Sequence, residues 1–129
     1  MKNKSTSFRE QFELNNKVAV VTGGTGILGK RFCAGLAEFG AKVAVVDLDE
    51  RNVVAYANEL QEIYGVECIG IACDVRQPDS VKNMRDDVEN ILGSIDILHN
   101  NAASKGSDLK EFLAPLEEYS LNTWNEVMS

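Results

Sequence analysis

The stretch KVAVVTGGTGILG, residues 17–29, decides the fold, because a continuous apolar run is followed at once by a cluster of glycines. An uninterrupted run of small and β-branched apolar residues is typical of a strand that is buried on both faces of a parallel sheet. The residues after the glycines, 27–39, place Phe32, Leu36 and Phe39 on one side of a helix. We therefore predict a buried strand, a tight turn and an amphipathic helix in direct succession.

The same alternation of strand and helix continues along the chain. After the first strand at 17–22, apolar runs predict strands at Lys42–Asp47, 67–73 and 95–98. Further helices are predicted at 50–64, capped by Asp49 and ended by Gly65, and at 78–92, with Pro78 in its first turn. Their expected buried stripes are Val53, Val54, Ala57, Leu60 and Ile63 in one helix, and Val81, Met84, Val88 and Ile91 in the other. A polar loop from Ser104 leads to a last helical segment that begins near Leu121.

This repeated pattern indicates an α/β protein. Right-handed crossovers predict a Rossmann-type doubly wound parallel sheet of order 3-2-1-4, which is incomplete because the full order continues with further strands. We expect residues 14–129 to be the N-terminal portion of a single Rossmann domain and residues 1–13 to be a polar arm. The fourth strand is expected to form a long, exposed apolar edge, which invites pairing with another chain. We therefore expect these residues to belong to a longer protein, a homo-oligomer in its full-length form, or to associate with a partner.

Composition and charge narrow the range of partners. The 129 residues are 44% hydrophobic and 26% charged with a net charge of −7, and a negative surface argues against nucleic acid or an anionic membrane as partner. No apolar run approaches the roughly 18 residues of a membrane span, and the N-terminus has no apolar signal segment. Cys33, Cys68 and Cys73 lie in apolar segments without a paired metal spacing. We predict a cytoplasmic protein with reduced core cysteines and no metal.

The glycine cluster has the spacing of a phosphate-binding loop, with Gly24, Gly26 and Gly29 in a G-x-G-x-x-G pattern that Gly23 precedes. One glycine allows the sharp turn out of the strand, another lets the backbone approach a pyrophosphate, and the last lets helix and strand pack closely. The N-terminus of the following helix directs free N–H groups at the phosphates. A plain tight turn is the competing interpretation.

Asp47 strengthens the case for a dinucleotide. It ends the second strand 18 residues after Gly29, about the interval expected for the carboxylate that binds an adenosine ribose. A carboxylate there repels the 2′-phosphate of NADP, and Leu48 offers no compensating cation. Arg51 is the nearest cation in sequence, one turn into the next helix. The sequence therefore predicts NAD as the cofactor.

Four features in order resemble the short-chain dehydrogenase/reductase family: TGGTGILG at 22–29, Asp47, CDV at 73–75 and NNAA at 100–103. The resemblance implies that Asp74 contacts the adenine amino group with help from the backbone of Val75, and that Asn101 and the residues after it line the cofactor cleft. Ala103 replaces the family's usual glycine. Turn formation for Asp74 and loop hydrogen bonding for Asn101 are the competing interpretations. The cofactor-binding residues predicted in this way are Gly23, Thr25, Gly26, Ile27, Leu28, Gly29, Asp47, Leu48, Asp74, Val75, Asn101, Ala102 and Ala103.

The sequence carries features of two different branches of the family. Ile27 stands where the single-domain branch usually has a glycine, and the spacing TGxxGxxG is typical of extended nucleotide-sugar epimerases and dehydratases. The segments IDILHNNAA and LNTWNEV resemble the single-domain branch instead, in which some sugar-acid and polyol dehydrogenases carry a TGGxGxLG loop. The resemblance thus implies an NAD-dependent oxidoreductase that acts on an alcohol or carbonyl, with a sugar-derived substrate favoured. An epimerase or dehydratase, and a dinucleotide-binding module without catalysis, are the alternatives.

The family's catalytic residues have no counterpart in these residues. The resemblance implies a serine and a Tyr-x-x-x-Lys pair, in which tyrosinate accepts the hydroxyl proton and lysine lowers the tyrosine pKa. Tyr56 and Tyr64 belong to a predicted helix, and Tyr119 has Thr123 four residues on. Ser104 directly follows the cofactor-lining loop. We therefore name no catalytic residue and expect the chain by itself to be inactive.

Overall fold

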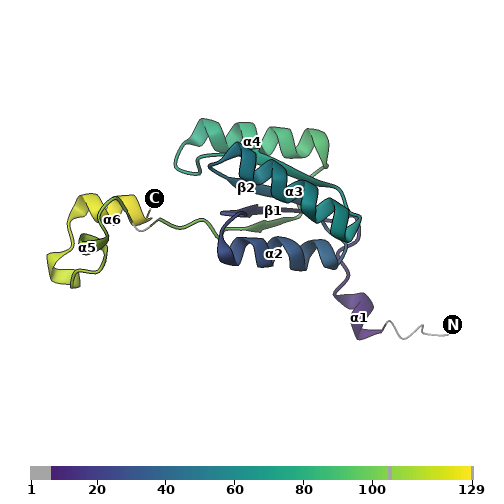
Figure 1. Ribbon diagram of the computed structural model, residues 1–129, viewed down its shortest axis with the longest axis horizontal. Coiled ribbons are helices and arrows are strands. Elements are labelled where there is room, and N and C mark those ends of the chain that lie inside the picture. Colours follow the sequence, from purple (N-terminus) through teal and green to yellow (C-terminus); the bar gives the residue numbers. More distant parts are fainter. Residues whose placement is uncertain (1–6, 105, 129) are drawn as a thin grey trace.

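The computed structural model describes residues 7–104 and 106–128, and its centre is a four-stranded parallel sheet (Figure 1). The strands are β1 (Val18–Thr22), β2 (Lys42–Asp47), β3 (Cys68–Ala72) and β4 (Ile97–His99). They lie in the order β3-β2-β1-β4, and every pairing is parallel. The predicted α/β class and strand order are therefore confirmed.

Helices cover both faces of this sheet, with α2 (Ile27–Glu38) and α4 (Pro78–Ile91) on opposite sides in Figure 1. Alternate side chains of β1 enter separate cores, because successive residues of a strand point to opposite faces. Ala19 and Val21 pack with α2 and with α3 (Glu50–Tyr64), whereas Val18 and Val20 pack with α4. Every residue of β1 is thus buried, because helices cover both faces of the strand.

The helix ends follow the local sequence. The Asp49 side chain accepts a hydrogen bond from the N–H of Asn52 and caps α3. Gly65 ends the same helix in the left-handed conformation, with φ of 69°. Pro78 occupies the first turn of α4. Short elements complete the chain: α1 (Phe8–Gln11), α5 (Leu109–Phe112), the 3₁₀ helix η1 (Leu116–Glu118) and α6 (Leu121–Met128). The helix near Leu121 was predicted, but the short ones in the arm and the polar loop were not.

The buried faces of the helices differ in part from the predicted stripes. In α2 the buried residues are the small Gly29, Cys33 and Ala37, while Phe39 is 44% exposed. Phe32 and Leu36 of the predicted stripe are partly buried and pack against the same core, so only Phe39 of that stripe lies outside it. Val54, Ile63 and Ile91 are likewise exposed, and Tyr56 and Leu92 are buried in the corresponding cores.

The edge strand β4 is short, and it begins two residues later than predicted. Asp96 exchanges hydrogen bonds with Val18, whose N–H donates to the Asp96 carboxylate at 2.9 Å and whose carbonyl accepts from the Asp96 N–H. Leu98 is 57% exposed on the face of the sheet that Val20 shares, and His99 stacks on Phe32 of α2 with ring centroids 4.2 Å apart. β4 is therefore only three residues long and includes a histidine, so the structure does not show the long apolar edge that the sequence predicted.

Within the described ranges, no helix is both long enough and apolar enough to cross a bilayer. The three cysteines are free thiols and buried, as predicted, and burial raises the pKa of the Cys33 thiol to about 12.

Candidate functional site

A cleft of about 650 Å³ lies at the carboxyl ends of the strands, where open α/β sheets place their ligands. The loops after all four strands contribute to it, and α6 adds two residues. Its lining comprises Gly23, Gly26, Ile27, Leu28, Gly29, Val46, Asp47, Leu48, Cys73, Asp74, Val75, Arg76, Asn101, Ala102, Ala103, Ser104, Glu126 and Val127. All the predicted site residues except Thr25 are thus brought to one cavity.

The glycine loop is shaped by close backbone contacts. Gly23 has φ of 62°, and a Cβ on it would lie 3.0 Å from the Cα of Ala102. A Cβ at Gly29 would overlap the carbonyl oxygen of Gly23, so the start of α2 approaches the turn as closely as backbone allows. Gly26 caps α2 without a side-chain hydrogen bond and is exposed, which leaves backbone N–H groups of the first turn available to an anion.

Hydrogen bonds of Thr22 connect the glycine loop to the loop that follows β4. The buried Thr22 hydroxyl accepts hydrogen bonds from the N–H groups of Asn101 and Ala102, both at 3.1 Å. The Asn101 amide nitrogen donates to the Gly23 carbonyl at 3.2 Å. The side chain of Asn101 therefore satisfies a loop carbonyl, as the competing interpretation expected, and the residue also lines the cleft. Its role toward a cofactor stays a prediction.

Asp47 is held by neutral donors. Its Oδ2 accepts from the Thr25 hydroxyl at 2.6 Å and from the Thr25 N–H at 3.1 Å, and Oδ1 accepts from the Leu48 N–H at 2.9 Å. Partial burial opposes ionisation, but these hydrogen bonds outweigh it and lower the pKa of Asp47 below its ordinary value. Among the described residues, no cation forms an ion pair with Asp47. Thr25, although outside the cleft lining, thus acts on the site through Asp47.

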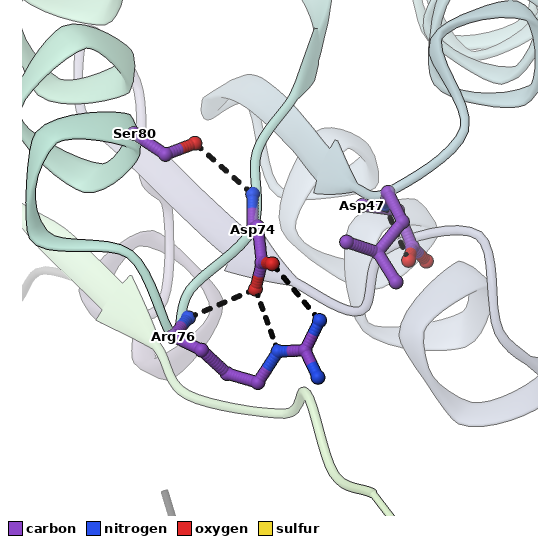
Figure 2. A network of polar contacts seen from close by, with 5 residues as sticks. Asp47, Asp74, Arg76 and Ser80 are labelled. Carbon is purple, nitrogen blue, oxygen red and sulfur yellow. Dashed lines mark hydrogen bonds and ion pairs between the residues drawn. The ribbon is translucent and has the colours of Figure 1, made fainter.

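Asp74, one strand further on, is held by a cation (Figure 2). The Arg76 guanidinium donates two hydrogen bonds to the Asp74 carboxylate, from Nε to Oδ1 and from Nη2 to Oδ2, and each is 2.9 Å long. The Arg76 N–H also donates to Oδ1, and the Ser80 hydroxyl accepts from the Asp74 N–H. The hydrogen bonds from Arg76 are the main cause of the lowered pKa of Asp74.

The lining residues that the sequence did not predict are Val46, Cys73, Arg76, Ser104, Glu126 and Val127. Arg76 had a signal in the sequence, since a cation two residues beyond a carboxylate at a strand end is within reach of it. Glu126 had none, because its place in the cleft depends on how α6 folds back; its carboxylate accepts hydrogen bonds from Ser107. Within the described ranges, no group of three or more acidic, cysteine or histidine side chains is arranged to hold a metal.

Comparison with known proteins agrees with this arrangement. The short chain dehydrogenase family matches residues 17–129, and the chain belongs to that family. It is 37% identical over 118 residues to D-threitol dehydrogenase of Mycolicibacterium smegmatis, an alignment that covers 92% of this chain and 43% of the relative. The chain therefore spans less than half the length of this relative.

Solved structures show the same fold. NAD⁺-bound xylitol dehydrogenase superposes with a TM-score of 0.76 at 31% identity, over 89% of this chain and 42% of that one. L-sorbose reductase of Gluconobacter frateurii, complexed with NADPH and L-sorbose, gives a TM-score of 0.71 at 28% identity, over 91% and 48% of the two chains. The two neighbours hold different nicotinamide cofactors, so they leave the choice between NAD and NADP open for this protein.

Proposed function

We propose that this chain forms the cofactor-binding part of an NAD-dependent oxidoreductase, which transfers hydride between nicotinamide and a hydroxyl or carbonyl group of a sugar-derived substrate. The observation that carries the choice of cofactor is Asp47, an ionised carboxylate in the cleft with no cation paired to it among the described residues. A 2′-phosphate beside it would place two negative charges together, whereas a ribose hydroxyl donates to it.

The other residues of the cleft fit a dinucleotide. The first turn of α2, which follows the exposed Gly26, offers backbone N–H donors to a pyrophosphate, and the absence of side chains at Gly23 and Gly29 keeps the loop narrow. Asp74 and Val75 line the part of the cleft at the end of β3, and we assign this part to the adenine ring. A bound nicotinamide would supply the hydride acceptor, and the hydrogen bond from the Asn101 N–H to the Thr22 hydroxyl holds the loop after β4 that lines the cleft.

The expected substrate class follows from the relatives. D-threitol dehydrogenase, xylitol dehydrogenase and L-sorbose reductase are named for polyols or a sugar, and they match most of this chain. This chain spans less than half the length of each of these proteins, so the similarity supports the class and not a particular polyol.

The cofactor proposal is tested by calorimetric titration of the protein with NAD⁺ and with NADP⁺. We expect NAD⁺ to bind at least tenfold more tightly, and Asp47→Ala to narrow the ratio about tenfold, as removal of one unfavourable charge contact would. Asp49→Ala is the matched control: it removes a nearby carboxylate that caps α3 and does not line the cleft, so it should leave the ratio unchanged. A preference for NADP⁺ in the unmodified protein would overturn the proposal.

Turnover separates an oxidoreductase from a binding module. The full-length protein should reduce NAD⁺ in the presence of polyols such as D-threitol or xylitol, with NADH absorbance as the readout. Tight NAD⁺ binding with no reduction by any polyol, alcohol or sugar would favour the module without catalysis. NAD that co-purifies and is not exchanged would favour the epimerase or dehydratase branch.

A further inference from the structure

One wall of the cleft, the helix α6, is separate from the two apolar cores of the sheet. Glu126 and Val127 of this helix are half-buried and line the cleft. Within the described part of the chain, neither core contains a residue of α6. Figure 1 shows α5 and α6 to one side of the sheet, beyond the extended loop that follows β4. Burial in a core therefore does not hold α6 at the cleft, and its polar contacts become decisive.

The carboxylate of Glu126 is fixed from within its own segment. Its Oε2 accepts hydrogen bonds from the Ser107 N–H at 2.9 Å and from the Ser107 hydroxyl at 3.1 Å. The Asn122 amide nitrogen donates to Oε1 at 3.4 Å. Gly106 lies close as well, since a Cβ on it would be 3.1 Å from Oε2. These contacts set the position of the carboxylate on α6.

Arg76 lines the same cleft from the loop after β3. Hydrogen bonds from Ser107 are the main cause of the lowered pKa of Glu126, and the positive charge of Arg76 lowers it further. The pKa of Arg76 is raised mainly by its hydrogen bonds to Asp74, and the negative charge of Glu126 adds to this. The guanidinium uses two of its five N–H groups on Asp74, so donors remain for a second carboxylate.

We propose that Glu126 is a positioning residue that attaches α6 to the loop after β3 through Arg76, and that this attachment slows the release of a bound dinucleotide. The inference rests on the proposed function. A dinucleotide in the cleft is bordered by both elements, so movement of α6 away from the loop widens its exit. A helix outside the cores moves more readily than one within them, and the attraction of opposite charges opposes that movement. The pair therefore acts on the rate of release and not on hydride transfer.

The sign of the effect separates this role from simple repulsion. Glu126 places a carboxylate beside a ligand that carries two phosphate groups, so its removal would by itself favour binding and slow release. Loss of the attachment to Arg76 would instead speed release. The side chain of Arg76 is 57% exposed, and exposed ion pairs are modest in strength and screened by salt. The attachment should therefore change the rate a few-fold at low ionic strength only.

The test is the dissociation rate of NADH, measured by stopped-flow fluorescence while excess NAD⁺ displaces it from the protein. We expect Glu126→Gln to raise this rate about threefold at about 20 mM salt and less than about 1.5-fold at about 0.5 M. In an Arg76→Met background the same substitution should change the rate less than about 1.5-fold, because the partner charge is absent. Glu117→Gln is the control, since Glu117 is an exposed carboxylate on η1 outside the cleft lining and should have no effect.

The outcomes are separable. A release rate that is unchanged or slower in Glu126→Gln would overturn the inference. An increase that is equally large at high salt, or in the Arg76→Met background, would overturn it as well, because the loss would then come from the contacts with Ser107. The proposed function stands in each of these cases, since NADH is bound. Failure of the unmodified protein to bind NADH would overturn the proposed function itself and, with it, this inference.

Discussion

Asp47 ends β2, Asp74 follows the neighbouring parallel strand β3, and both line the same cleft, yet they are held by different kinds of donor. Asp47 accepts from a hydroxyl and two backbone N–H groups, all of them neutral. Asp74 accepts from a guanidinium on both oxygens. Both pKa values are lowered, but only the second carboxylate has its charge compensated.

If both carboxylates bind the proposed cofactor, the difference suits them to separate tasks. A carboxylate that is ionised and uncompensated exerts a field, which suits discrimination between a hydroxyl and a phosphate. A carboxylate paired with arginine exerts little net field and offers a fixed hydrogen-bond acceptor instead, which suits recognition of a base edge. The environment of each aspartate, and not its residue type, therefore determines what it can distinguish.

The largest effect is expected from Gly29→Ala, which should disturb the hydrogen bonds of Asp47 and leave those of Asp74 unchanged. The new methyl group would overlap the Gly23 carbonyl and displace the loop that carries Thr25, so we expect the free energy of unfolding to fall by about 3 kcal/mol and NAD⁺ binding to weaken more than tenfold. Urea unfolding and calorimetry measure the two. Gly35→Ala in the same helix is the control, because nothing lies within 4 Å of its Cβ, and it should stabilise the protein slightly. Equal behaviour of the two variants would contradict the close approach at Gly29.

A smaller effect, on cofactor preference, is expected from Asp74→Asn. This change removes the charge that compensates Arg76, and the uncompensated guanidinium then lies in the cleft that also contains Asp47. We expect the affinity for NADP⁺ relative to NAD⁺ to rise about fivefold by calorimetry, because the uncompensated cation attracts the additional phosphate.

The double variant Asp74→Asn with Arg76→Met should lose that gain, because the cation is then absent as well. If the ratio stays the same in the single variant, Arg76 does not reach the ribose end, and the two aspartates act independently of each other.

Strand order and cleft position were predictable because they depend on repeated patterns. An apolar run bounded by glycines identifies a buried strand in any surroundings, and Asp47 follows directly from its place at the end of such a run. The buried face of α2 was not predictable in the same way. Its members, Gly29, Cys33 and Ala37, are small, and the larger Phe39 carries a stronger hydrophobic signal although it lies outside the core.

Polar contacts between side chains were the least predictable part of the site. The hydrogen bond from Thr25 to Asp47 joins residues 22 positions apart, and it exists only because the glycine turn directs Thr25 toward the end of β2. The pairing of Arg76 with Asp74 is local in sequence. Whether an arginine forms a bidentate pair with a carboxylate, however, depends on side-chain rotamers that a sequence does not specify. Charge compensation, which separates the two aspartates, therefore required the structure.

The smallest effect is expected from Thr25→Val, which sharpens the comparison by removing one donor from Asp47 while the shape of the side chain is kept. Loss of the 2.6 Å hydrogen bond should raise the pKa of Asp47 toward its ordinary value of 3.8 and reduce the free energy of unfolding at pH 7 by about 1 kcal/mol. Thr25→Ser keeps the hydroxyl and should recover most of this loss.

The pH dependence of the same loss has a definite sign. Because folding lowers the pKa of Asp47, its stabilising contribution is complete above the unfolded value near 3.8 and is lost as the pH falls through the lower folded value. The difference in unfolding free energy between the unmodified protein and Thr25→Val should therefore be constant from pH 7 to about 5 and shrink below 3.8. Urea unfolding at a series of pH values measures it. A difference that persists unchanged at pH 3 would mean that the hydroxyl stabilises the loop by packing or by another partner, and that Asp47 owes its lowered pKa to the backbone N–H groups alone.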